Sequence, residues 1–130
     1  YFLRLILLQH WRAVETREES RHDDADRRLF YDFRALLEDN FSRHWTVPEY
    51  AHRLKCTPLR LNGVCRAFTR QTANGVILGR LAEEARRLLV FTTAPAAHIA
   101  ARLGFQEPSY FTRFFRRQNG MTPGEFRQRQ

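Results

Sequence analysis

Two short apolar segments on either side of a glycine constrain the fold of this chain most. The first segment, residues 97–105, has an apolar stripe at helical spacing made by Ile99, Ala100 and Leu103. Gly104 follows, at a place where a left-handed residue ends a helix. A second segment begins near Pro108, with Phe111 and Phe115 at i and i+4. Two short helices around one tight turn are typical of a helix-turn-helix, whose second helix lies in a DNA major groove.

The rest of the chain predicts further helices. Apolar residues at spacings of three and four indicate an amphipathic helix from about Leu29 to Phe41. Threonines suited to cap the first turn of a helix are Thr46, Thr57, Thr72 and Thr122. Glu49, three residues after the first of them, completes a capping box. The helix that begins after Thr57 is expected to bury Leu61, Val64, Cys65 and Phe68. No segment alternates with period two, so we predict an all-α fold.

The first 19 residues predict a helix with a wide apolar face. Such a face is not left in water, so we expect it to pack on its own domain, to pair with a second copy, or to contact an upstream domain. Residues 18–24 are all polar and predict a linker at a domain boundary. We therefore expect the end of a longer protein, with residues 1–25 as a partial dimerisation helix and linker and residues 26–130 as the second domain.

The positive charge of the chain is concentrated in its C-terminal two thirds. The formal net charge is +8, with net −1 over residues 1–45 and net +9 over residues 46–130. A basic region of this kind favours a polyanionic partner. Lys55 is the single lysine, and the other cations are arginines, whose planar fork suits phosphates and guanine edges.

An internal repeat organises the basic region. Residues 47–69 and 96–119 both read as a short helix with an alanine on its inner face, a tight turn, and a second helix with polar residues outward. This predicts two helix-turn-helix units, at about 46–72 and 94–119, joined by a linker helix at about 73–91. A helix of that length spans roughly 28 Å, close to one turn of B-DNA at about 34 Å. The two second helices are thus suited to successive major grooves on one face of a duplex.

Residues at a dozen fixed spacings carry a resemblance to a known family: Leu61-Asn62, Cys65-Arg66, Arg80-Leu81, Glu84 to Leu89, Ile99-Ala100, Leu103-Gly104-Phe105, Tyr110-Phe111, Arg113 to Arg117, Gly120 and Thr122-Pro123. In this arrangement the chain resembles the AraC/XylS transcription regulators over about residues 28–127. The resemblance implies a double-stranded DNA-binding domain preceded by a dimerisation helix and an N-terminal effector domain. It also implies a transcription activator that is a homodimer through residues 1–19 and contacts RNA polymerase. The branch it resembles most senses small aromatic acids, which would bind only in the missing N-terminal domain.

The same resemblance assigns the DNA contacts by family position. The implied base-edge contacts are Leu59, Arg60 and Asn62 in the first unit and Pro108, Ser109 and Arg113 in the second. The implied phosphate contacts are Arg66, Thr112, Arg116 and Arg117. Arg113 is the strongest of these assignments, because it lies off the buried stripe and a bidentate arginine contributes about 1–3 kcal/mol of discrimination for guanine. Asn62 suits adenine, and Leu59 and Pro108 suit a thymine methyl group.

The chain departs from the family pattern at three places. Gly63 stands where an arginine is usual, which removes one expected contact from the first unit. Arg70 stands at a turn that normally uses glycine, so we expect it to be left-handed at a cost of about 1 kcal/mol. Pro95 and His98 replace the usual cap and inward glutamate, so the second unit is expected to lack a capping box.

We predict no catalytic, metal or cofactor site. His52 and Cys56 share a helix face at i and i+4, but tetrahedral zinc needs three or four ligands. Cys56 and Cys65 are expected to be reduced core thiols in a cytoplasm. The apolar opening segment is too short for a membrane span. Two alternatives to sequence-specific DNA binding stay open: a protein-interaction module with a basic face, and a nonspecific RNA or single-strand binder.

Overall fold

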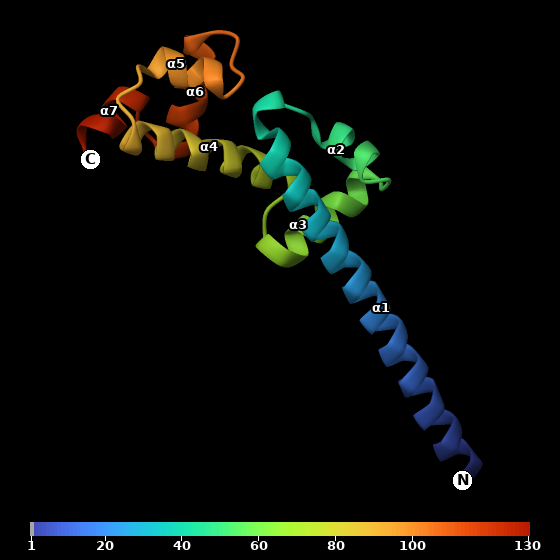
Figure 1. Ribbon diagram of the computed structural model, residues 1–130. Helices are drawn as coiled ribbons and strands as arrows, with labels where there is room; N and C mark the ends of the chain where they lie inside the picture. Colours follow the sequence, from blue (N-terminus) through green and yellow to red (C-terminus); the bar gives the residue numbers. More distant parts are fainter. Residues whose placement is uncertain (1) are drawn as a thin grey trace.

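The computed structural model describes the backbone of residues 2–130 and the side chains of residues 21–130. Over this range the chain forms helices and no strand, which confirms the predicted all-α fold. In chain order the elements are α1 (Phe2–Asn40), the 3-10 helix η1 (Phe41–Arg43), α2 (Val47–Arg53), α3 (Pro58–Thr69), α4 (Ala73–Phe91), α5 (Ala96–Arg102), α6 (Pro108–Asn119) and α7 (Pro123–Gln128). Figure 1 shows α2 and α3 beside the C-terminal half of α1, and α5, α6 and α7 gathered around the far end of α4.

Helix α1 continues through the residues that were predicted to form a linker. Residues 18–24 are helical, so the prediction of a break was wrong. Polarity alone does not end a helix: α1 contains neither glycine nor proline, and oppositely charged residues such as Asp23 and Arg27 stand at i and i+4. The domain boundary at residue 25 stays a prediction. The side chains predicted to form the dimerisation face, in residues 1–19, lie outside the described residues.

The predicted helix starts are confirmed at all four threonines. Each hydroxyl accepts a hydrogen bond from the backbone N–H three residues later, at 3.0 to 3.4 Å. At Thr46 the box is complete, because the Glu49 carboxylate accepts the Thr46 N–H at 2.6 Å. Pro95 leaves α5 without a side-chain cap, and Arg70 is left-handed with φ of 62°, both as predicted.

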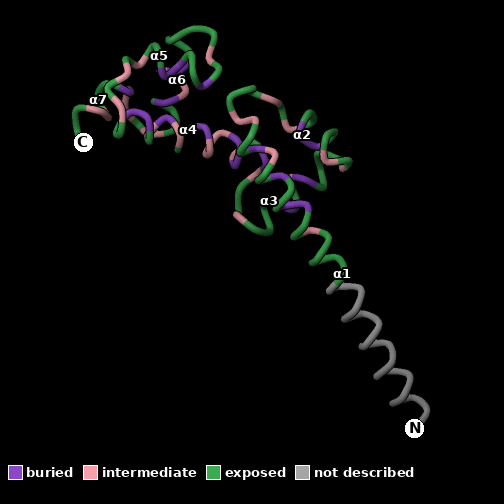
Figure 2. Tube along the Cα trace, viewed as in Figure 1, coloured by how far each residue is buried: buried purple, intermediate pink, exposed green. Residues whose placement is uncertain are grey.

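The buried residues form two hydrophobic cores. Figure 2 marks the buried positions in purple along the Cα trace. The first joins α1, α2, α3 and the start of α4, and its largest members are Phe33, Leu37, Tyr50 and Leu61. The second joins the rest of α4 to α5 and α6, and its largest members are Leu89, Ile99, Leu103, Phe111 and Phe115. Helix α4 therefore belongs to both, with Ala73 to Ile77 in the first core and Leu81 to Leu89 in the second.

One residue of the predicted stripe on α3 is not buried. Phe68 is 43% exposed, whereas the other three members are buried. Its ring stacks on Phe30 of α1 with the centroids 5.1 Å apart, and this contact covers one face of the ring. The prediction that Phe68 is a core residue was wrong, because helical spacing defines a face but not how far the neighbouring helix covers it.

Both cysteines are free thiols. Cys65 is buried, and this burial raises its pKa to about 11. Cys56 is half-buried against the first core, and burial raises its pKa as well. The two thiols are therefore neutral at physiological pH and act as small apolar side chains. In the described part of the chain, no helix combines the length and the apolar character that crossing a membrane requires.

Candidate nucleic-acid interface

The turn between the two helices, here called the corner, has the same backbone geometry in both helix-turn-helix units. In each, the first helix is followed by a left-handed residue, Lys55 with φ of 58° and Gly104 with φ of 88°. The next residue then donates its backbone N–H to a carbonyl five residues earlier. These matching bonds run from Cys56 to Ala51 at 3.0 Å and from Phe105 to Ala100 at 2.9 Å. The predicted repeat is confirmed, and α3 and α6 are the equivalent second helices.

Helix α3 turns its first residues to solvent. Leu59 is 83% exposed, and Arg60 and Arg66 are exposed as well. An aliphatic side chain with so little packing suits contact with a thymine methyl group. The guanidinium of Arg60 lies 3.5 Å from the Asp26 carboxylate of α1. Because both partners are well exposed, this pair is worth only about 0–1 kcal/mol, and Arg60 is available to another anion.

Asn62 has a structural role that the base assignment did not anticipate. Its Oδ1 accepts the backbone N–H of Ala73 at 2.9 Å, and the side chain is half-buried. Bidentate recognition of adenine uses the amide oxygen and nitrogen together, and here the oxygen is already engaged. Asn62 thus joins α3 to the first residue of α4, and its predicted base contact competes with this hydrogen bond.

Asn62→Ala is expected to lower the free energy of unfolding by about 1–3 kcal/mol, because the fully buried Ala73 would keep an N–H without a partner. Urea unfolding measures the change. Asn62→Asp, which keeps an acceptor oxygen at the same place, serves as the control and should retain most of the stability. Wild-type unfolding of the alanine variant would contradict the structural role.

Helix α6 separates its buried and exposed residues cleanly. Phe111 and Phe115 are fully buried, as predicted. The three predicted base readers, Pro108, Ser109 and Arg113, are all exposed. The Arg113 guanidinium lies over the half-exposed Tyr110 ring, 5.1 Å from its centroid.

The four residues assigned to phosphates differ in their exposure to solvent. Arg66 on α3 and Arg116 and Arg117 on α6 are exposed. Thr112 is half-buried, and its hydroxyl donates to the Pro108 carbonyl at 3.1 Å. A phosphate would therefore have to draw this hydroxyl away from the helix backbone.

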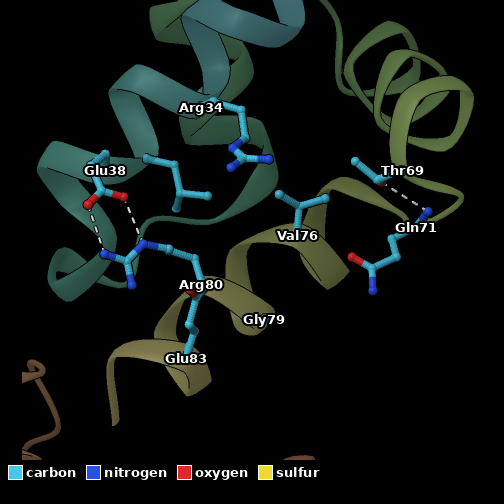
Figure 3. A pocket seen from close by; sticks show the side chains of 9 residues that line it. Arg34, Glu38, Thr69, Gln71, Val76, Gly79, Arg80 and Glu83 are labelled. Atoms are coloured by element: carbon cyan, nitrogen blue, oxygen red, sulfur yellow. Dashed lines mark hydrogen bonds and ion pairs between the residues drawn. The ribbon is translucent and has the colours of Figure 1, made fainter. Parts of the chain in front are cut away.

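Among the described side chains, the ion pairs lie on α1, α3 and α4, and none involves α6. The Glu38 carboxylate accepts two hydrogen bonds from Arg80, at 2.7 and 2.8 Å, and these bonds hold the pKa of Glu38 below its usual range (Figure 3). Glu84 is held in the same way by Arg87, and its pKa is lowered too. Among the described side chains no acid pairs with Arg113, Arg116 or Arg117. Helix α6 thus offers three cations to an outside partner.

A groove beside this ion pair carries both signs of charge. Figure 3 shows Arg34 and Glu38 of α1 on one side and Arg80 and Glu83 of α4 on the other. Across residues 21–130, no three His, Cys, Asp or Glu side chains gather closely enough to hold a metal ion.

Comparison with known proteins connects this geometry to a family. The family model described as a helix-turn-helix domain matches residues 50–129. The arabinose operon regulatory protein of Escherichia coli (strain K12) is 27% identical over 119 residues, which are 89% of this chain and 40% of that protein. The HTH-type transcriptional activator RhaR of Enterobacter sp. (strain 638) is 28% identical over 93 residues, 72% of this chain and 33% of that protein. The chain thus spans between a third and two fifths of the length of these relatives.

A solved structure has the same fold. The C-terminal domain of AraT, a response regulator from Geobacillus stearothermophilus, superposes with a TM-score of 0.72 at 23% identity, covering 78% of this chain and 85% of that one.

Proposed function

The chain belongs to the AraC-type helix-turn-helix family of transcription regulators, and from this premise we propose that it reads two successive major grooves of double-stranded DNA with α3 and α6. The observation that carries the proposal is the repeated corner, which gives both helices the same place in their units. Helix α4, with 19 residues and therefore roughly 28 Å long, separates the two units by nearly one turn of B-DNA.

In this proposal, some residues of α3 and α6 contact base edges and others contact phosphates. The base-edge contacts come from Leu59 and Arg60 of α3 and from Pro108, Ser109 and Arg113 of α6. Asn62 contacts a base only when its hydrogen bond to the Ala73 N–H breaks and a base takes its place. The phosphate contacts come from Arg66, Thr112, Arg116 and Arg117, which position the chain without reading sequence.

The wider role follows from the relatives and is proposed for a longer protein. One relative is named a transcriptional activator, and activation is the role we propose here. Such a protein would act in the cytoplasm as a homodimer through residues 1–19 and contact RNA polymerase. A small aromatic acid inducer would bind in an N-terminal effector domain, and this DNA-binding domain would itself catalyse no reaction.

Selection from randomised duplexes tests the proposal. The expected result is a motif with two boxes about 10 base pairs apart, one for each major groove. Enrichment without a motif, or stronger binding to single strands, would instead support a nonspecific nucleic-acid binder. Absence of nucleic-acid binding would favour a protein-interaction module.

Salt dependence provides a separate prediction for the phosphate contacts. Each phosphate neutralised contributes about −0.9 to the slope of log affinity against log salt, so Arg116→Ala is expected to flatten the slope by about one unit on every sequence. Arg87→Ala, which also removes one cation but one already paired with Glu84, should leave the slope unchanged. Lost affinity with an unaltered slope would show that Arg116 does not act through a phosphate.

A further inference from the structure

The segment that follows α1 contacts the second helix-turn-helix unit, although in the sequence it lies directly before the first unit. After η1 the chain turns at His44, which is left-handed with φ of 58°. The Nε2–H of His44 donates to the carbonyl of Leu103 at 2.8 Å. The imidazole also meets the Phe105 ring edge-on, with the centroids 4.7 Å apart. These two partners flank Gly104, the left-handed residue of the second corner.

Position 104 requires glycine because η1 packs closely against it, and not only because its backbone is left-handed. Non-glycine residues adopt the left-handed region elsewhere in the chain, at His44, Lys55 and Arg70. Lys55 even holds the same place in the first corner that Gly104 holds in the second. The difference lies in the surroundings, because a Cβ on Gly104 would lie 1.9 Å from the backbone oxygen of Ser42. Only a residue without a Cβ allows η1 to approach the second corner this closely.

The same segment also braces the joint between the two units. Phe41, the first residue of η1, packs against both cores. The Arg80 guanidinium lies over its ring, 4.7 Å from the centroid, and is held in place by Glu38 of α1 (Figure 3). Arg80 stands where α4 passes from the first core to the second, between Ile77 and Leu81. A bend of α4 at this point would change the separation of α3 and α6, and the contacts of Phe41 and Arg80 oppose it.

We propose that residues 41–44 are a clasp that sets the distance and angle between α3 and α6, and that the chain thereby discriminates the spacing of its two DNA boxes. The second part rests on the proposed function, whereas the first part does not. One inserted base pair moves a box along the duplex by about 3.4 Å and rotates it by about 35°. Units held by the clasp lose the contacts of one recognition helix after such a displacement. Without the clasp, the two units are joined by α4 alone, and a bend of α4 lets both recognition helices keep their contacts with the displaced boxes.

Two variants open the clasp by different routes. His44→Ala removes the bond to Leu103 and the ring contact with Phe105, and Gly104→Ala places a Cβ against Ser42. Lys55→Ala is the matched control, since it also puts alanine at a left-handed residue, in the corner of the first unit. Residual dipolar couplings of backbone amides, measured without DNA, report whether the units are one rigid body. Wild type and control should fit one alignment tensor for both units, and the two clasp variants should need two tensors.

A second measurement compares affinity for duplexes in which one base pair is added or removed between the boxes that the wild type selects. Wild type and control should lose affinity by about tenfold or more, because one recognition helix no longer meets its bases. The clasp variants should lose about threefold or less, since their second unit can follow its box.

The outcomes separate the clasp from DNA reading. A single tensor and an unchanged spacing preference in His44→Ala would overturn the clasp, and this variant decides the matter even if Gly104→Ala fails to fold. A wild type that selects no pair of boxes would overturn the proposed function, while the couplings would still decide whether the clasp exists.

Discussion

Phe111→Ala should lower the free energy of unfolding by about 3–5 kcal/mol, because it leaves a cavity at the centre of the second core. Phe111 is fully buried, and its ring lies between those of Phe105 and Phe115, with centroids 5.4 and 5.9 Å away. A domain of this size has a total stability of about 5–15 kcal/mol, so this one substitution should remove a large share of it. Thermal and urea unfolding followed by circular dichroism measure the loss.

The same substitution at an exposed phenylalanine provides the control. Phe91, at the end of α4, is 77% exposed, and Phe91→Ala should change the stability by no more than about 0.5 kcal/mol. Equal losses of stability in the two variants would contradict the burial of Phe111 in the second core and the exposure of Phe91.

Arg113→Ala should weaken binding to the selected site by about 1–3 kcal/mol and relax the preference at one base pair. Arg113 is exposed on α6, and its guanidinium is positioned by the Tyr110 ring. Since no acid among the described side chains pairs with it, it can direct both arms of its fork at a guanine edge. Selection from randomised duplexes, repeated with the variant, measures the preference at every position.

Arg117→Ala is the matched comparison for this prediction. Both variants lose one exposed arginine of α6, and neither alters the buried pair Phe111 and Phe115. Arg117→Ala should weaken binding to all sequences alike, as expected for a phosphate contact. If the Arg113 variant returned the wild-type preference at every position, Arg113 would not be a base reader.

Several elements were predictable because their causes lie within a few residues of chain. A threonine directly before a segment with helical apolar spacing marks a helix start, and all four such threonines cap as expected. The buried stripe of α6 follows from the spacing of Phe111 and Phe115 alone. The left-handed Gly104 and Arg70 follow from the turn that each must make.

Other features depended on what the fold brings alongside a segment. The polar residues 18–24 suggested a linker, but they form helix because nothing in their local chemistry breaks it. Asn62 suggested a base contact, yet its oxygen is engaged by Ala73, which lies 11 residues away in the sequence. The sequence alone does not show whether the Asn62 side chain faces solvent or accepts the N–H at the start of α4, because that depends on how α3 and α4 pack.

The helices from α2 to α7, four of their threonine caps and the family could be predicted from the amino-acid sequence, because hydrogen bonding and apolar periodicity act over one or two helical turns. The contacts that hold the two units together could not be predicted in this way, because they join residues that are distant in the sequence. His44 and Leu103 are 59 residues apart, and their bond forms because two cores place η1 against the second corner. The glycine at 104 is a turn residue by sequence, whereas the approach of Ser42 makes it a contact between the units. Such a contact depends on the packing of whole helices, which local spacing does not specify.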